Sequence, residues 1–514
     1  MFYKRFLGFL ACFSLFVSIS FAGAQEISPE DAALFSDMAQ SEADRLVDYL
    51  PPTDDEVALA SVSIYDYLYD SLMLLEERID LTSYEYTKDD PKALSDDYIT
   101  VLNMHPELYY VSRGYRYYWN GEGKIGYLEP TYTTRDRRQI NDEIFRIQLA
   151  MDRYLTGIDD SMSDLEKLMV IHDRLVFGCE YDESLTRHAA RDLLVDGIAV
   201  CQGYACAFYA LADRVGIKSG FVTSGEMNHI WNVFCIDGEW YHADATWDDP
   251  LPDMYSRINH KYFLKSNQAM LQTHTDFPLI EGASAKYDDA FWNPVRSPII
   301  PLGGVYFYIL QEGKDVFLRR YSTNSGDTRT LYRFEKPWNA GPGYIWNTVF
   351  SGLGYHDGRL YFNTADAVYS TDLYGRTLRA EPVSLSQEER AAKNLYGLFV
   401  WNDYLYTAVG ERTSATNAVS YGTPLFLGYP QRRLYVCDAY KIGLEKHTVY
   451  VNQQLAPATF AFYEKKNGRL SQTRFVRASD MFIDVAVPGE FASSTLAVWD
   501  EQLRPLCELQ YFFR

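Results

Sequence analysis

The 514-residue sequence predicts a multidomain protein in which an α+β core, with one helix packed on an antiparallel sheet, precedes an all-β C-terminal region. The first observation is the length, since one hydrophobic core rarely organises so long a chain. The second is a helical apolar period over residues 201–215, followed by hairpin signals. The third is that short strand patterns replace helical ones from about residue 303 onward.

The composition excludes several classes of protein. A hydrophobic content of 47% supports folded domains rather than disorder. The net charge of -22 argues against nucleic-acid binding, which needs clustered Lys and Arg, and against adhesion to anionic lipid. We therefore predict no nucleic-acid partner. Along the chain we predict five parts: a signal peptide (1–24), an N-terminal helical and α+β companion region (25–155), an α+β core domain (156–295), a β-rich region of blade-like repeats (300–442) and a β-sandwich-like domain (443–514).

The N-terminus has the pattern of a secretory signal. Lys4 and Arg5 precede an apolar stretch over residues 6–21, and the small residues 22–24 form a cleavage site. A membrane anchor is the alternative, but the cleavage pattern favours removal. No later stretch approaches the roughly 20 apolar residues of a spanning helix. We expect a secreted or extracytoplasmic protein, associated with the cell surface or free.

Residues 25–155 alternate between helical and strand patterns. Helices are predicted from Ser28 and over residues 58–75, separated by Pro51-Pro52. Two aromatic-rich strands follow at residues 115–119 and 124–132. A helix is then predicted over residues 135–155. Four of its residues are expected to face inward: Ile140, Ile144, Ile147 and Leu155.

Cys201 is the candidate nucleophile. The run 199–208 predicts a loop that ends where a helix begins, with Cys201 at the junction and Gly216 just past the helix end. The partial positive charge of the helix N-terminus would lower the pKa of the thiol, and the thiolate is the reactive form. A single Cys on a helix is more often a small buried hydrophobe. The assignment therefore depends on its partners.

Those partners come from a predicted hairpin. Strands at residues 229–236 and 239–246 flank an Asp-Gly turn, so paired positions sum to 475. His229 and Asp244 are then diagonal neighbours about 7–8 Å apart, within reach through their side chains. An acid beside an imidazole, aimed at a helix-capping thiol, is the arrangement that activates a sulfur nucleophile. On this register four side chains share one face: His229, Trp231, Asp244 and Thr246.

These residues resemble the papain- and transglutaminase-like core of the transglutaminase-like superfamily. Three motifs carry the resemblance, which covers roughly residues 160–255: Cys201-Gln202-Gly203-Tyr204, His229-x-Trp231-Asn232 and Asp244-x-Thr246-Trp247-Asp248-Asp249-Pro250. Upstream, residues 171–173 and 181–182 also resemble its lead-in helix. Ala199 stands where the family often has glycine, which could alter the approach to the thiol. No departure removes a catalytic group.

The resemblance implies an acyl-transfer enzyme with a thioester intermediate on a protein or peptide substrate. Cys201 would attack an amide, His229 would transfer the proton and Asp244 would orient the imidazole. The backbone N–H of Cys201 is an oxyanion donor, and the side-chain candidates are Gln202, Trp231 and Asn232. Hydrolysis is favoured over amine cross-linking, because calcium-dependent accessory domains are lacking. The alternative is a noncatalytic cell-surface binding module that retains the fold.

No cofactor is expected. Six Cys beyond the predicted signal are too sparse for a disulfide scaffold, and Cys206 is assigned to packing. No CxxC or HExxH spacing predicts zinc. One acidic cluster leaves calcium as an alternative, but a turn of solvated acids is favoured: Asp244, Asp248, Asp249 and Asp253.

The C-terminal half has strand patterns only. Three similar strand starts, near residues 304, 358 and 403, resemble the β-blade units of surface repeat proteins. Each is expected to precede a second strand, at residues 318–321, 368–370 and 434–437. Four later strands are compatible with a small β-sandwich: 448–451, 460–463, 482–487 and 495–499. Exposed aromatics there would suit a cell-wall or surface glycan, although cross-strand packing is the simpler account.

Overall fold

The computed structural model describes residues 25–26, 63–251, 257–313, 315–335, 338–341, 344–345, 350–383, 385–401, 404–412, 419–421 and 424–427, and seven strands between residues 436 and 513. The predicted signal and the helix expected from Ser28 lie outside them. Residues 154–432 fall in one compact unit, and the described residues up to 153 and from 433 onward in another. No helix in the described part of the chain is long and apolar enough to cross a bilayer.

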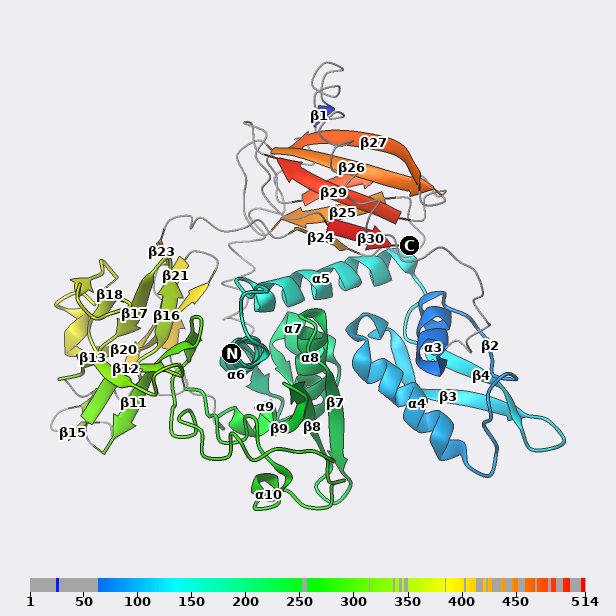
Figure 1. Ribbon diagram of the computed structural model, residues 1–514, viewed down its shortest axis with the longest axis horizontal. Helices are drawn as coiled ribbons and strands as arrows, with labels where there is room; N and C mark the ends of the chain where they lie inside the picture. Colours follow the sequence, from blue (N-terminus) through cyan, green and yellow to red (C-terminus); the bar gives the residue numbers. More distant parts are fainter. Residues whose placement is uncertain are drawn as a thin grey trace. The chain divides into compact units, whose positions relative to one another are not determined.

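Residues 63–155 form a three-stranded sheet and several helices, of which α3 (Ile64–Met73) and α4 (Pro91–Met104) lie near the sheet (Figure 1). The sheet order is β2 (Ile79–Asp80), β4 (Ile125–Tyr132) and β3 (Val111–Trp119), which confirms both predicted aromatic strands. The other helices are the short η2 (Pro106–Leu108) and α5 (Arg137–Leu155). All four inward positions predicted for α5 are buried.

The strands after residue 435 form two antiparallel sheets. One contains β24 (Val436–Ala439), β25 (Lys446–Val451) and β28 (Phe482–Ala486). The other has the order β1 (Gln25–Glu26), β27 (Arg469–Ala478), β26 (Ala458–Lys466), β29 (Ser493–Trp499) and β30 (Gln510–Phe513). The four predicted strands are present, and β27 was not predicted.

Residues 156–299 carry the α+β core. Its helices are α6 (Asp164–Gly178), α7 (Ala190–Asp196), α8 (Cys201–Arg214), α9 (Ala245–Asp248) and α10 (Asn267–Met270). The antiparallel sheet is β7 (Ser219–Ser224), β8 (His229–Ile236) and β9 (Glu239–Ala243). A short parallel pair, β5 (Glu180–Tyr181) and β6 (Ile198–Ala199), lies before α8.

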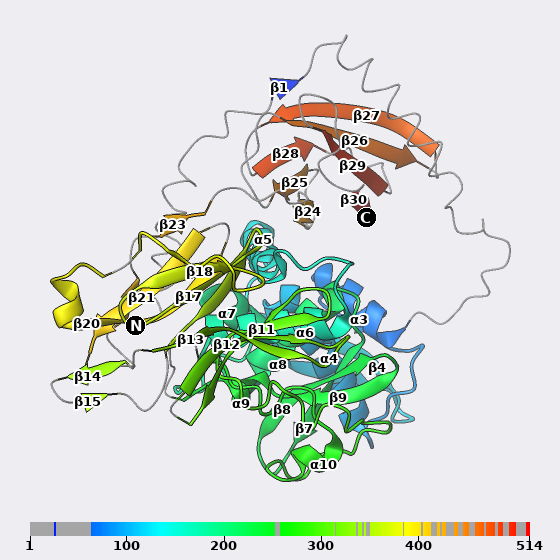
Figure 2. The ribbon, with the colours of Figure 1, turned by 60° about the vertical axis from the view of Figure 1, so that its left-hand side comes forward.

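Helix α8 is the centre of this core. It contacts α6, α7, β7 and β8, and Figures 1 and 2 show it beside α7 and the sheet. Every residue from 203 to 212 is buried, so the single apolar stripe predicted from the sequence was too narrow. Small residues allow this close packing from several sides. The helix ends before Gly216, which has the predicted left-handed conformation with φ 79°.

Helix α6 begins with a capping box. The Ser163 hydroxyl accepts the Glu166 N–H, and Glu166 Oε2 accepts the Ser163 N–H at 2.9 Å. Glu166 Oε1 also accepts the Gly304 N–H at 2.8 Å. One buried carboxylate thus ties the helix start to the first part of the β-rich region.

The predicted hairpin register is correct, but the second strand is shorter than expected. Residue pairs from Asn232↔Ala243 to Ile236↔Glu239 sum to 475, and the turn residues Asp237 and Gly238 both have positive φ. The strand ends at Ala243, because Asp244 caps α9 by accepting the Trp247 N–H. Thr246 is therefore helical, and its predicted place on the strand face was wrong.

The β-rich region contains three four-stranded antiparallel sheets and a two-stranded pair, β14 (Asn339–Gly341) with β15 (Tyr344–Ile345). The first has β10 (Ile300–Pro301), β11 (Val305–Glu312), β12 (Asp315–Ser322) and β13 (Thr328–Arg333). The second has β16 (Leu353–His356), β17 (Arg359–Asn363), β18 (Val368–Asp372) and β19 (Arg379–Ala380). The third, after η3 (Glu389–Ala391), has β20 (Lys393–Trp401), β21 (Tyr404–Glu411), β22 (Val419–Tyr421) and β23 (Leu425–Phe426).

The three predicted strand starts correspond to β11, β17 and β21. The second strands expected in the first two repeats are β12 and β18. The third expectation was wrong, because β24 pairs with β25 in a different sheet and β21 pairs instead with β22. Sequence spacing alone could not distinguish the short β22 from the later strand.

Candidate active site

Cys201 is the first residue of α8, and its thiol is free and partly exposed. The preceding residue, Val200, donates its N–H to the Arg187 carbonyl at 2.9 Å, which fixes the entry to the helix. The parallel pairing of Tyr181 with Ala199 places Tyr181 near the sulfur. The pKa of Tyr181 is raised first by burial and then by the charge of Cys201, which reflects this proximity.

His229 and Asp244 are in direct contact. His229 Nε2 lies 2.7 Å from Asp244 Oδ2, and Asp244 is completely buried. Burial lowers the pKa of His229, but its hydrogen bonds to Asp244 and to Cys201, with the charges of both partners, outweigh that effect and raise the pKa to about 10. The imidazolium form is therefore strongly favoured beside the carboxylate.

The hydrogen bond between Cys201 and His229 completes a connected series of three side chains. Asp244 engages Nε2 of His229, which leaves Nδ1 as the ring nitrogen available to the thiol. Cys201 is the first residue of α8, His229 is the first residue of β8, and Asp244 is the residue that caps α9. This is the geometry of a base-activated sulfur nucleophile oriented by a third group.

The sequence comparison agrees with this geometry. Residues 152–245 match the transglutaminase-like superfamily, and the match contains all three side chains. This segment is a transglutaminase-like core.

Two curated relatives are kyphoscoliosis peptidases, from Mus musculus and Homo sapiens. Each is 26% identical over 166 residues, which covers 27% of this chain and 23% of the relative. The chain thus spans less than a quarter of the length of the curated relatives that it matches.

Two solved structures are also similar. A protein from Cytophaga hutchinsonii described as a cysteine protease is 17% identical, with 27% of this chain and 63% of that chain covered, and a TM-score of 0.17. A TGase structure is 13% identical, with 33% and 50% covered, and a TM-score of 0.18.

Two residues beside the three side chains were not predicted to belong to the site. His274 Nε2 lies 3.0 Å from Asp244 Oδ2, and the Trp247 ring lies 4.3 Å from the His274 ring and 5.8 Å from that of His229. Trp247 keeps 38% of its surface exposed, so it covers the two histidines on the solvent side. Its place in the third motif was a signal for Trp247, but no sequence pattern pointed to His274.

The predicted oxyanion candidates have different environments. Trp231 Nε1 donates to His242 Nδ1 at 3.0 Å, and Asn232 Nδ2 donates to the Ala205 carbonyl at 3.0 Å. These hydrogen bonds connect β8 to β9 and to α8, so both side chains hold the fold together. Gln202 lies in the first turn of α8, directly after Cys201.

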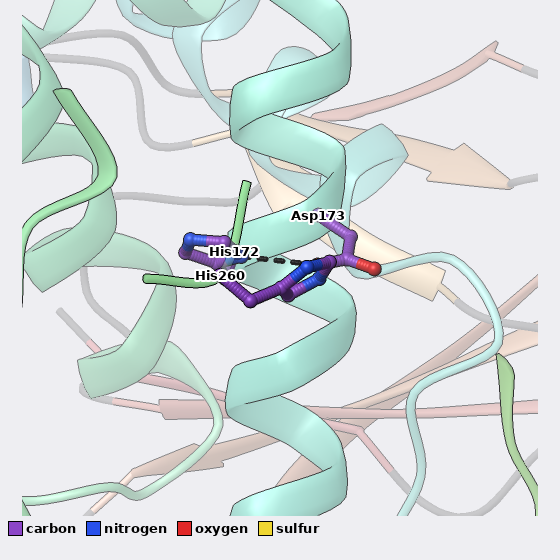
Figure 3. Close-up of side chains that lie close together, drawn as sticks. All are labelled: His172, Asp173 and His260. Carbon is purple, nitrogen blue, oxygen red and sulfur yellow. Dashed lines mark hydrogen bonds and ion pairs between the residues drawn. The ribbon is translucent and has the colours of Figure 1, made fainter. Parts of the chain in front are cut away.

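A second buried network lies in the transglutaminase-like core (Figure 3). His172 Nδ1 and His260 Nε2 both approach Asp173 Oδ1, at 3.0 and 2.9 Å. His172 Nε2 faces Asp248 Oδ2 at 3.2 Å, and His260 Nδ1 faces the Val295 carbonyl at 3.1 Å. Each ring nitrogen of the two histidines faces an oxygen, and a His172 ring that carries both protons donates to two carboxylates. The network ties α6 to α9 and to the segment after it.

The charges in this network stabilise each other. Burial lowers the pKa of His172, but the hydrogen bonds to Asp173 and Asp248 outweigh it and raise the pKa to about 9. Burial raises the pKa of Asp173, but its electrostatic interactions and hydrogen bonds with His260 and His172 hold that pKa below its usual value. Asp173 Oδ2 also accepts the Ile299 N–H at 2.7 Å.

Two sets of side chains in the described part of the chain offer donors for a metal ion. They are His172, Asp173 and His260, and His229, Asp244 and His274; within each set the donor atoms lie within 4.8 Å of one another. Hydrogen bonds between the same atoms account for both arrangements without a metal.

The acidic cluster predicted as a solvated turn is buried. Asp244, Asp248 and Asp249 are at most 6% exposed, and each accepts hydrogen bonds, Asp249 from the Tyr204 hydroxyl. The prediction was wrong because sequence alone did not reveal the buried His and Tyr donors that stabilise these carboxylates. Asp253 lies outside the described residues.

Proposed function

We propose that the protein is a cysteine-dependent acyl-transfer enzyme that acts on protein or peptide amides through Cys201, His229 and Asp244. The observation that carries the proposal is the connected hydrogen-bond series from thiol to imidazole to buried carboxylate. The transglutaminase-like core gives independent support for an enzyme of this general class.

The proposed reaction has two steps. The Cys201 sulfur attacks the amide carbonyl carbon while His229 holds the thiol proton, and the new C–S bond forms a tetrahedral intermediate. The backbone N–H of Cys201, at the helix start, is the proposed oxyanion donor, with Gln202 as the side-chain candidate. The C–N bond then breaks as His229 gives its proton to the leaving amine, which leaves a thioester on Cys201.

Asp244 orients the imidazole and stabilises its positive charge throughout. In the second step, His229 takes a proton from water, the hydroxide attacks the thioester, and the proton returns to the sulfur as the acid leaves. An amine in place of water would give cross-linking. We favour hydrolysis, and the two acceptors give products of different mass.

We further propose that the protein is exported, with the signal at residues 1–24 removed. The three four-stranded sheets after residue 300 are proposed as blade-like repeats, and the strands after residue 435 as a β-sandwich. In this proposal the β-rich half binds a surface or cell-wall glycan, which would keep the enzyme near its peptide substrates.

A thiol-labelling experiment tests the proposal. Cys201 and Cys235 are both free and partly exposed, so Cys235 is a matched internal control. We expect iodoacetamide at pH 6–7 to alkylate Cys201 at least tenfold faster than Cys235 in the full chain, as measured by peptide mass spectrometry. Substitution His229→Ala should remove that preference while circular dichroism stays unchanged. Equal labelling of the two thiols would favour the noncatalytic binding module instead.

Turnover should be measured on the same variants. The wild type is expected to release the alcohol from a glutamine-peptide ester, and His229→Ala to reduce that rate by at least a hundredfold. Unimpaired release by His229→Ala would exclude the proposed base.

A further inference from the structure

His274 is a buried histidine that lies beyond the matched segment 152–245. It follows α10, and its backbone N–H donates to the Met270 carbonyl at 2.8 Å. Its side chain is completely buried. Its Nε2 lies 3.0 Å from Asp244 Oδ2, the oxygen that His229 Nε2 approaches at 2.7 Å. Two imidazoles from different segments therefore share one carboxylate oxygen.

The hydrogen bonds of Asp244 explain why a buried carboxylate remains charged. Oδ2 accepts from His229 and His274, and Oδ1 accepts the Trp247 N–H at 3.2 Å. Burial raises the pKa of Asp244, but the hydrogen bonds from His229 and then His274 outweigh it and hold the pKa below its usual value. His274 thus supplies one of three donors that stabilise the carboxylate.

The ring of His274 is itself fixed. Its Nδ1 lies 3.0 Å from Thr273 Oγ1, so a ring with its proton on Nε2 donates to Asp244 and accepts the Thr273 hydroxyl. Four aromatic rings lie close to it: Trp247 at 4.3 Å, Trp231 at 4.9 Å, Tyr262 at 5.3 Å and His229 at 5.9 Å.

Four titratable groups face His274 from the elements packed against it: Asp244 and His229, with His242 of β9 and Tyr262. Asp244 is the carboxylic acid among these four groups, and it is the one that faces His274 Nε2 at hydrogen-bond distance. The arrangement directs the proton of His274 toward the carboxylate.

We propose that His274 is a positioning residue, which holds Asp244 ionised and in the orientation that supports His229. The inference rests on the proposed function, since it assigns His274 a part in the same site. Without this donor the carboxylate can rotate or take up a proton, and its support for the His229 imidazolium weakens. The reactive thiolate and imidazolium pair would then form only at higher pH.

The test compares three variants of the full chain. His274→Gln retains an amide donor near the position of Nε2, and His274→Leu removes the donor with little change in volume. His356→Leu removes another buried histidine, from β16 in the β-rich region, and controls for loss of a buried ring. Circular dichroism melting identifies variants that fail to fold.

The first readout is the rate of iodoacetamide alkylation at Cys201 between pH 5 and 9. We expect His274→Leu to react at least tenfold more slowly than the wild type at pH 6 and to approach it above pH 8. His274→Gln and His356→Leu should stay within threefold at every pH. On a peptide ester, His274→Leu should lower kcat with KM changed less than twofold. A folded His274→Leu variant with the wild-type pH profile would overturn the proposal, as would a Gln variant that is as impaired as Leu.

A second readout does not depend on turnover. The titration of His229 is followed by NMR with labelled histidine in Cys201→Ala and in Cys201→Ala/His274→Leu. Weaker support from Asp244 should lower the His229 pKa by at least one unit in the double variant. If the wild type acylates nothing, the proposed function fails, while this titration still decides the role of His274. An unchanged His229 titration would overturn that role.

Discussion

The Cβ of Ala199 lies 2.4 Å from the position that a Cβ on Gly203 would take, and the Ala189 carbonyl oxygen lies 3.1 Å from it. Helix α8 therefore approaches β6 and the start of α7 too closely for any side chain at residue 203. This contact lies two positions after Cys201, the candidate nucleophile at the start of the same helix. It also gives a physical reason for glycine in the Cys201-Gln202-Gly203-Tyr204 motif.

Substitution Gly203→Ala should destabilise the core by about 1–3 kcal/mol, the usual range for overpacking. It should also slow alkylation of Cys201, because the helix start must shift. Urea denaturation and the iodoacetamide rate measure the two effects. The double variant Ala199→Gly/Gly203→Ala should recover part of both losses. If Gly203→Ala is neutral in both measurements, the steric account is wrong.

Substitution Asp173→Asn should lower the free energy of unfolding by about 3–5 kcal/mol, because it removes one of the two carboxylates that face the buried His172 imidazolium. Asp173 has two histidine partners and a backbone donor, as Figure 3 shows in part. Denaturant unfolding gives the value. The exposed Asp160→Asn is the control and should change stability by less than about 0.5 kcal/mol. Equal effects of the two substitutions would contradict a stabilising role for the network.

Stability should fall as the pH rises from 7 to 10. The pKa of His172 is raised from its ordinary value to about 9, so its contribution is complete below about pH 6.5 and is lost as the pH passes 9. His229, with a pKa of about 10, acts in the same direction. Melting temperatures measured across this range should decline in the wild type and decline less in His172→Asn. Identical slopes would mean that His172 is not charged in the folded protein.

Two substitutions in the capping box of α6 should lower the free energy of unfolding by different amounts. Ser163→Ala removes one side-chain cap and should cost about 1 kcal/mol. Glu166→Ala removes the reciprocal cap and also the bond to Gly304, so it should cost more. Thermal unfolding of both variants checks the order. A Ser163→Ala variant less stable than Glu166→Ala would show that the bond to Gly304 contributes little.

Local sequence signals predicted the elements that present Cys201 and His229, but not the helix α9 that Asp244 caps. The apolar period placed Cys201 at the start of α8, and the Asp-Gly turn fixed the register of β8 and β9. Each of these signals depends on residues within a few positions of one another, which sequence patterns capture.

Long-range partners could not be predicted in the same way. His274 and His260 have no local pattern, and their roles appear only where the chain returns to Asp244 and Asp173. The burial of Asp248 depends on His172, 76 residues earlier. Similarly, the assignment of β24 to a different sheet depends on strand pairing after residue 445.

The most direct test is to mix the full chain with a glutamine-peptide ester, quench with acid and locate the acyl group by peptide mass spectrometry. We predict an acyl mass on the peptide that contains Cys201, none on Cys235, and loss of the adduct in Cys201→Ala. Absence of any acyl adduct in the folded wild type, or equal acylation of Cys235, would contradict the proposed nucleophile.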